Sequence, residues 1–480
     1  MRWSEKIESI REFWFEFRHQ KSGLLGLALL VVLVLISIFA PAIVPSEASK
    51  KWRDLTYWED NPKSAPPAWI NLFTSKKYFT HKVVDMNLTE EKMLGSIREL
   101  TYELNLDYDS DIPPSDLILQ IFMNKREGNE TPPTVMLKVY RPDGTKINLL
   151  NRKVKFSALN ETIRKARILI TTEEYAKDSV YALVAQVEPP EELVNINKDL
   201  LKITVPMSAK SQMRIHSLER SVPLKGRYRF LLKVYLLDPE DQVLSVRLTL
   251  VGAVYGLAGT DDYRSDLFAG LVWGTRVSLL VGVMTSVLSV LFGVFYGVLS
   301  AYLGGWTDEA LQRVNEIVAS IPLLPILILL ASLFKPSVWN IVLILVVFGW
   351  TGTAKVVRSM GYQLKEADYV EAARAMGAGW RWIVFRHMMP QILPYTFASM
   401  ALSVPGAILA EAGISFLGLG DIERVTWGQI LHDAQKAAAA LKGMWWWVIP
   451  PGLAIALVGL AFVLLGTALD RVLNPKMRTL

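Results

Sequence analysis

Long apolar runs limit what this chain can fold into more than any other feature. The run at 23–43 has no charged residue, and a helix that crosses a bilayer needs about 20 mostly apolar residues. Nothing comparable follows until a second group of runs near the C-terminus. These later runs lie at 277–303, 317–334, 339–356, 394–417 and 447–469. The pattern predicts a polytopic α-helical membrane protein with six spans.

Composition agrees with a mixture of membrane-embedded and polar parts. Of the 480 residues, 51% are hydrophobic and 20% are charged, and the mean hydropathy is +0.27. These values are too apolar for an ordinary soluble protein and too polar for one embedded along its whole length. The absence of cysteine excludes disulfides, thiolate metal sites and cysteine nucleophiles. The net charge of +6 is explained by basic residues on the cytoplasmic side of a membrane, so lipid rather than nucleic acid is the expected partner.

The first run and the basic residues around the spans predict the orientation. A cleaved signal peptide is the competing interpretation, but the run is long for one and 41–49 is a poor cleavage site, which favours an uncleaved first helix at 23–45. Residues 1–22 then form a cytoplasmic segment. Basic residues also gather at 355–386 and 471–478, so we expect both termini in the cytoplasm. The long segment after the first span consequently faces outward.

That outward segment, 46–256, is polar and is predicted to be a separate α+β domain rich in strands. The turn Arg141-Pro142-Asp143-Gly144 lies between short apolar runs and predicts a hairpin. Four further segments have residue patterns typical of strands or helices. We expect a second hairpin from 228–237 and 243–255, and helices at 158–170 and 172–187.

Three N-x-[ST] sequons, the acceptor pattern for N-glycosylation, occur in the outward segment. They begin at Asn87, Asn129 and Asn160. Exposure on the outer side makes glycosylation one interpretation, and chance occurrence of so short a pattern is the other. No cluster of His, Asp or Ser residues in this segment suggests a catalytic or metal site.

The remaining region, 257–480, holds five predicted spans and a charged cytoplasmic segment at 358–390. The pattern of that segment is a helix, a break at Gly377 and a second helix that begins near Trp380. We expect Gly377 to let the chain reverse direction without a side-chain clash.

The first helix of the cytoplasmic segment has the features of a contact surface. We expect Tyr369, Val370, Ala373 and Met376 to share one face. Small residues such as Ala372 would allow close approach by another protein. An amphipathic helix lying on lipid headgroups explains the pattern equally well.

The order of short motifs resembles the permease subunits of binding-protein-dependent ABC importers. Glu371-Ala372-Ala373, then Gly377, then His387-Met388-Met389-Pro390 are similar to the EAA loop of that family. The position of His387 resembles the C-type subunit of the dipeptide/oligopeptide group, whose members import peptides, nickel complexes or oligosaccharides. The likeness continues at 259–279, 408–428 and 451–475 and covers about half of the chain.

The resemblance implies the type I ABC importer permease fold in a prokaryotic cell membrane. It implies three kinds of partner: a second related permease subunit, two ATPase subunits inside and a substrate-binding protein outside. The ATPase subunits would bind ATP and Mg²⁺. This chain lacks a phosphate-binding G-x-x-x-x-G-K-[ST] loop and is expected to bind no cofactor or metal and to catalyse no reaction. The ATPase-coupling residues that the resemblance implies are Tyr369, Glu371, Ala372, Ala373, Met376, Gly377, His387 and Pro390.

Two further residues are candidates for the pathway or the permease interface. Glu411 is the one acid well inside a predicted span, where a carboxylate suggests function, and Pro405 lies in the same span. A structural pairing or a position near the outer surface is the alternative for Glu411.

Some features depart from the family, and other classes of protein stay open. The family commonly has Gly-Arg where this chain has Arg264-Ser265, and the outward segment is several times longer than the usual loop. Oligosaccharide is the alternative to oligopeptide as the solute. A secondary transporter would not need the cytoplasmic segment. A membrane-anchored surface receptor that uses 46–256 is the alternative from a different class.

Overall fold

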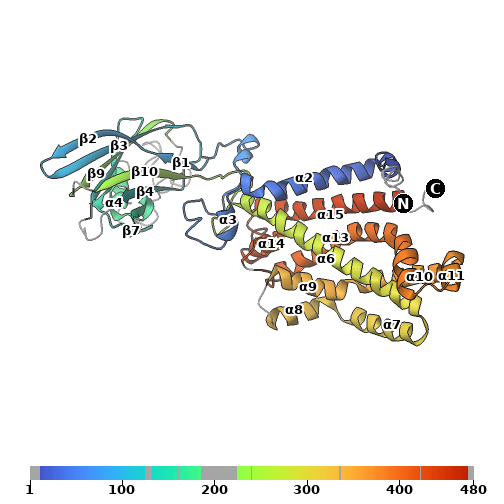
Figure 1. The fold of residues 1–480 in the computed structure, drawn as a ribbon. Coiled ribbons are helices and arrows are strands. Elements are labelled where there is room, and N and C mark those ends of the chain that lie inside the picture. The colour runs from blue at the N-terminus through green and yellow to red at the C-terminus, as the bar shows by residue number, and fades with distance from the viewer. Residues whose placement is uncertain are drawn as a thin grey trace. The chain divides into compact units, whose positions relative to one another are not determined.

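The computed structural model describes residues 11–124, 132–159, 162–184, 224–238, 241–333, 337–421 and 423–473. The chain divides into two compact units (Figure 1). The helical unit comprises Met1–Asp54 with Leu267–Leu480, and the sheet unit comprises Leu55–Asp266.

The sheet unit begins and ends later in the chain than the predicted outward domain at 46–256. The segment after the first span belongs to the helical unit because its side chains pack there. Arg53 forms an ion pair of 2.8 Å with buried Asp433, and the ring of Trp52 fills the space beside Gly270. Burial raises the pKa of Asp433, and the Arg53 guanidinium opposes that shift.

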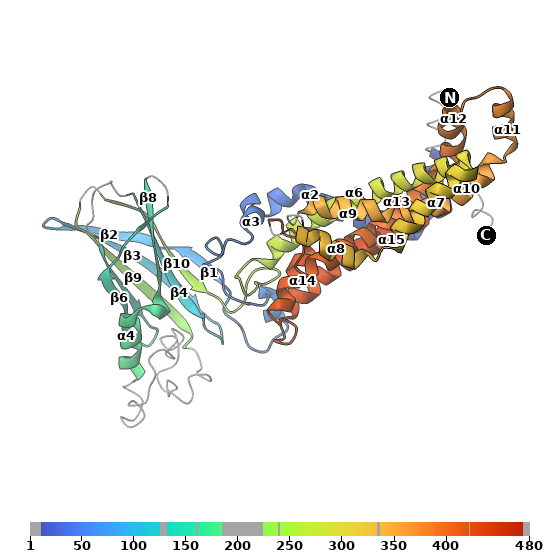
Figure 2. The ribbon, with the colours of Figure 1, turned by 90° about the horizontal axis from the view of Figure 1, so that it is seen from below.

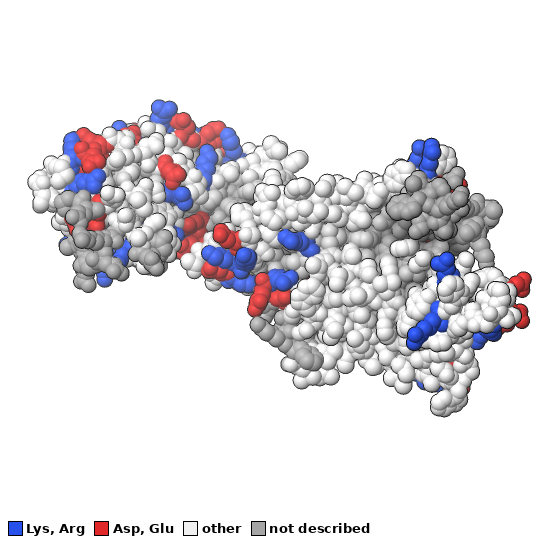
Figure 3. All heavy atoms as spheres, in the orientation of Figure 1, with Lys and Arg blue, Asp and Glu red and all other residues white. Residues whose placement is uncertain are grey.

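Five helical stretches among the described residues are long and apolar enough to cross a membrane. They are α2 (Lys21–Ile43), α6 (Leu267–Leu303), α9 with α10 (Val338–Gly349 and Thr351–Lys365), the run Trp380–Phe416, and α15 (Trp445–Leu473). Helix α13 (Met389–Phe416) packs against α6 and α15, and α2 packs against α15 and α6 (Figures 1 and 2). Figure 3 shows a broad uncharged surface over the middle of the helical unit, as contact with lipid requires.

The predicted third span at 317–334 is not one continuous helix. Its residues are divided between α7 (Gly305–Ser320) and α8 (Leu323–Leu333), and the axes of the two helices differ by 76°. Pro322 explains the break, because proline disfavours the helical conformation in the residue before it. Ile321 accordingly has extended dihedral angles, φ −75° and ψ 121°. A sixth span exists only if this bent pair is counted as one.

Glycines bring α6 and α10 into close contact. A Cβ atom at Gly297 would lie 2.6 Å from the carbonyl oxygen of Ala354, and one at Gly293 would lie 2.7 Å from that of Trp350. The Gly293–Gly297 spacing is the G-x-x-x-G arrangement that lets helix backbones approach in membranes. The second half of α6 is thereby held against α10.

The sheet unit is built from two five-stranded antiparallel sheets. One has the order β1 (Lys82–Asp85), β10 (Gln242–Val251), β4 (Asp116–Asn124), β8 (Ile163–Leu169) and β7 (Ser157–Ala158). The other has the order β2 (Asn87–Leu94), β3 (Ile97–Tyr108), β9 (Gly226–Leu236), β5 (Thr134–Tyr140) and β6 (Lys146–Lys153). Their buried side chains form one core, with Leu119 and Leu248 from the first sheet and Leu137 and Val234 from the second.

The hairpin around Gly144 has the predicted form, but two other expectations for this unit are wrong. β5 pairs with β6, and Gly144 has φ +81°, which its turn requires. β9 and β10 do not form a hairpin, because they lie in different sheets. Residues 163–169 form strand β8 instead of a helix, with Ala166 and Ile168 buried at alternate positions.

The second predicted helix and one sequon fall on described residues. Helix α4 covers Glu174–Val184, within the predicted 172–187. Asn87 is exposed at the start of β2, whereas Asn129 and Asn160 lie outside the described residues.

His81 in the sheet unit makes stability depend on pH. Its ring lies against that of Tyr255 at 5.3 Å between centroids, and burial lowers the pKa of His81 to about 4, although Asp60 opposes the shift. The unfolded chain therefore takes up a proton below about pH 6.5, before the folded one does. Up to about 3 kcal/mol of stability is lost as the pH falls from 7 to 4.

We expect His81→Phe, which keeps the ring contact, to remove that part of the pH dependence of thermal unfolding. Replacement of exposed His19 by Phe is the control, and an unchanged pH profile in His81→Phe would contradict the assignment.

Candidate functional site

The predicted cytoplasmic segment forms a bracket of short helices between two long ones. Helix α11 (Asp368–Ala375) follows α10 after a two-residue turn, and α12 (Trp380–Trp382) leads into a π-helical turn at Ile383–Met388. This turn joins α13 directly. Most of 358–390 is thus continuous with the neighbouring spans, because α10 extends to Lys365 and the helical run restarts at Trp380.

Gly377 ends α11 in a Schellman arrangement. The N–H of Ala378 donates to the carbonyl of Ala373 at 3.0 Å, and the N–H of Gly377 donates to that of Arg374 at 3.0 Å. Gly377 has φ +84°, and no atom lies within 4 Å of where its Cβ would be. The constraint on this position is the backbone conformation and not the side-chain clash that the sequence suggested.

The four residues that were expected to share one face of α11 lie on two different sides of the helix. Val370 and Ala373 are buried, whereas Tyr369 and Met376 are exposed, Met376 to 83%. Glu371 and Ala372 lie on the exposed side, so of the small residues proposed for contact Ala373 is turned inward. His387 lies beneath this face, with its ring centroid 6.2 Å from that of Tyr369, and Pro390 is exposed in the first turn of α13.

The buried side of α11 belongs to one apolar cluster that joins four helices. We call it the bracket core. Its fully buried members are Val290, Val294 and Val298 of α6, Val357 of α10, Val370 of α11, Ile383, Val384 and Met388 of the π turn, and Ile392 of α13. Protein interiors are close-packed, so a displacement of α11 has to move these neighbours as well.

A carboxylate network fixes α7 to α10 next to the bracket. The carboxylate of buried Asp308 accepts hydrogen bonds from Nε of Arg358 at 2.7 Å and from the hydroxyl of Tyr362 at 2.6 Å. Ser300 of α6 donates to the same group. This network was not predictable from the sequence, because Ser300 and Tyr362 are 62 residues apart and no member stands in a motif.

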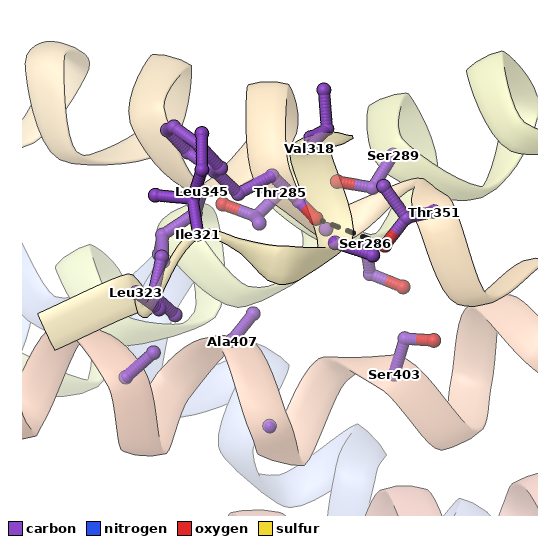
Figure 4. A pocket seen from close by; sticks show the side chains of 15 residues that line it. Thr285, Ser286, Ser289, Val318, Ile321, Leu323, Leu345, Thr351, Ser403 and Ala407 are labelled. Carbon is purple, nitrogen blue, oxygen red and sulfur yellow. Dashed lines mark hydrogen bonds between the residues drawn. The ribbon is translucent and has the colours of Figure 1, made fainter. Parts of the chain in front are cut away.

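A cavity of about 340 Å³ lies between the helices of the helical unit. Its walls come from α6, α7, α8, α9, α10 and α13, and none of its described lining residues is charged. Figure 4 shows Ser403 and Ala407 of α13 on one side and Ser289 and Thr351 on the other.

Hydroxyl groups give the cavity its polar character. Ser286 donates to the carbonyl of Met400 at 2.5 Å, and Ser403 donates to that of Ser399 at 2.7 Å. The hydroxyls of Thr285 and Ser289 have no hydrogen-bond partner among the described residues. Thr285, Ser286 and Ser289 lie together on α6, and hydroxyl residues grouped in an apolar span are a signal that could have been found in the sequence.

The two pathway candidates from the sequence do not line this cavity. Glu411 is 1% exposed, and Ser415 donates a hydrogen bond of 2.6 Å to its carboxylate. It lies where α13 packs against α14 (Trp427–Lys436), since a Cβ at Gly428 would lie 2.6 Å from Cα of Ala412. Pro405 is close to Gly459 of α15. Both residues thus take part in packing within the chain.

Comparisons with known proteins agree with this architecture. A family model described as the inner membrane component of binding-protein-dependent transport systems matches residues 289–479, and one described as the N-terminal TM domain of oligopeptide transport permease C matches 9–67. The two matches leave 68–288, which includes most of the sheet unit, uncovered.

Curated relatives are similar over about half of this chain. The dipeptide transport system permease protein DppC of Bacillus subtilis is 37% identical over 221 residues, which are 46% of this chain and 68% of that protein. The oligopeptide transport system permease protein OppC of Haemophilus influenzae is 36% identical over 242 residues, which are 50% of this chain and 76% of that protein. The solved inward-facing MetNI methionine ABC transporter overlaps 42% of this chain and 94% of its own, at 19% identity and a TM-score of 0.35. From the two family matches and these permease relatives, we conclude that the chain belongs to the dipeptide/oligopeptide family of ABC transporter permeases, as a C-type subunit.

Proposed function

We propose that this non-catalytic permease subunit forms, with a second related permease, the membrane pathway of an ATP-driven importer for oligopeptides. Two relatives are named as dipeptide and oligopeptide transport permeases, and this supports the choice of solute. The observation that carries the proposal is the bracket, which presents an exposed surface on one side and the bracket core on the other. An extracytoplasmic binding protein delivers the solute, and both termini of this chain lie in the cytoplasm of a prokaryotic cell.

Docking of an ATPase subunit on the bracket would couple ATP hydrolysis to the pathway. The exposed side chains of Tyr369 and Met376 supply an apolar contact, with Glu371 at its edge. ATP and Mg²⁺ bind to the two ATPase subunits and not to this chain. Closure of the ATPase pair displaces α11, and the bracket core passes that displacement to α6, α10 and α13. Because these same helices line the cavity, its access alternates between the two sides of the membrane.

The lining of the cavity suits solutes whose side chains vary. Hydroxyls such as Thr285 and Ser289 can bond to the backbone amides that every peptide shares, and an uncharged wall selects no particular charge on the solute. Oligosaccharides carry hydroxyl groups that would bond in the same way, so they are the competing solute class. Uptake of a labelled oligopeptide that excess oligosaccharide fails to inhibit would support the peptide assignment.

The exposed surface of the bracket can be tested with a charge substitution. We expect Met376→Asp to reduce ATP-driven uptake about tenfold in vesicles that hold the assembled transporter, because about 1.4 kcal/mol of lost docking free energy corresponds to that factor. Leu441→Asp is the matched control, since Leu441 is also highly exposed in the helical unit but lies between α14 and α15. Equal losses in the two variants, or co-purification of the ATPase with Met376→Asp at the unaltered yield and full uptake, would exclude the docking role.

The backbone requirement at Gly377 predicts a difference between two substitutions. Leucine in a left-handed conformation costs about 1–2 kcal/mol, whereas asparagine tolerates it. We expect Gly377→Leu to shift the end of α11 and to uncouple ATP hydrolysis from uptake, while Gly377→Asn retains most transport. ATPase activity and uptake are measured on the same vesicles. Normal transport by Gly377→Leu would show that the geometry of this turn is not needed for coupling.

A further inference from the structure

The sheet unit exposes an apolar cluster that its core does not use. The short helix η1 (Ala68–Leu72) and the residue after it carry Leu72 and Phe73, whose side chains are 81% and 79% exposed. Trp69 and Leu257 are exposed beside them. We call these four residues the aromatic patch. Large side chains exposed together in this way mark a contact with another apolar surface.

Hydrogen bonds hold the aromatic patch in a fixed shape. Nε1 of Trp69 donates to the carbonyl of Leu257 at 2.8 Å, and the N–H of Ala68 donates to that of Gly256 at 2.9 Å. The rings of Trp69 and Phe73 meet edge to face with 6.1 Å between centroids. The exposed side chains are therefore presented by an ordered turn.

The aromatic patch lies in the part of the sheet unit from which the chain leaves toward the membrane spans. The chain enters and leaves the sheet unit through two segments that are hydrogen-bonded to each other. The N–H of Thr260 donates to the carbonyl of Ala65 at 2.8 Å, and the N–H of Ser64 donates to that of Asp261 at 2.9 Å. From Leu257 to Leu267, where α6 begins, the chain has about ten residues and reaches at most about 35 Å. The patch is tethered within that reach of a helix that crosses the bilayer.

The side-chain types are those of a membrane interface. Tryptophan is favoured at the headgroup level of a bilayer. Exposed Lys63 and Lys76 flank the patch in sequence, and lysine can extend its ammonium group to the headgroups. The short tether to α6 and the side-chain types together favour lipid over a soluble protein as the surface that the aromatic patch contacts.

We propose that the aromatic patch inserts into the headgroup and acyl boundary of the bilayer and holds the sheet unit at the membrane surface. This contact is independent of which solute the transporter carries. It would limit the positions that the sheet unit can take relative to the bilayer.

A single labelled cysteine can measure the insertion, because the chain has no cysteine of its own. The full chain carrying Phe73→Cys, labelled with an environment-sensitive fluorophore, is reconstituted into phosphatidylcholine vesicles whose acyl chains are brominated. Leu72→Cys provides a second position if the first variant does not fold. Met93→Cys is the matched control, since Met93 is a similarly apolar and exposed residue of the sheet unit on β2, away from η1.

We expect the label at position 73 or 72 to emit at shorter wavelength than the label at 93 and to be quenched several-fold more by the brominated lipid. Equal lipid quenching at the two sites, with full access to aqueous iodide, would overturn the proposal. Shielding that develops only after a substrate-binding protein is added would also overturn it, because the patch would then be a protein-docking surface.

Discussion

The packing of the bracket core is the constraint on which the working parts of the helical unit depend. α11 is short, and a helix of this length has little stability of its own in water. It keeps its place because Val370 belongs to the same buried cluster as side chains of the π turn and α6, and Ala373 is buried too. The same burial leaves Tyr369 and Met376 outside. One set of apolar contacts thus orients the exposed surface and connects it to the spans.

Close backbone approach carries this connection into the membrane. The glycines of α6 leave no space between α6 and α10, and the Asp308–Arg358 pair ties α7 to the same helix. The cavity lies among the helices that these contacts join. The hydroxyls that line it come from α6, α10 and α13, all of which contribute side chains to the bracket core. On the proposed mechanism, a small shift of α11 would change the shape of the cavity through these contacts.

Local signals in the sequence predicted local structure well and long-range structure poorly. The turn at Gly144 and the helix end at Gly377 were predictable because each depends on one residue with positive φ. The sheet membership of β9 and β10 was not predictable, since β9 pairs with β3 and β5, which are far from it in sequence. The apolar content of 317–334 predicted one span, and the structure has a break there at Ile321-Pro322. For α11, periodicity could not distinguish Val370 from Tyr369, because the partners that bury Val370 are brought there by the fold. Arg264 was likewise not predicted to adopt a positive φ: it has φ +69°, and its guanidinium donates to the carbonyl of Asn61 at 2.8 Å.

The transmission of movement from the bracket to the cavity is the central claim, and one measurement tests it directly. The assembled transporter is prepared with a single cysteine, Ser403→Cys, in the cavity wall, and its rate of reaction with a water-soluble maleimide is measured with and without ATP. The account predicts a several-fold difference in rate between the two nucleotide states, and loss of that difference when Val370→Ala and Ile383→Ala loosen the bracket core. Equal rates in the two states, or a full difference retained in the loosened variant, would contradict it.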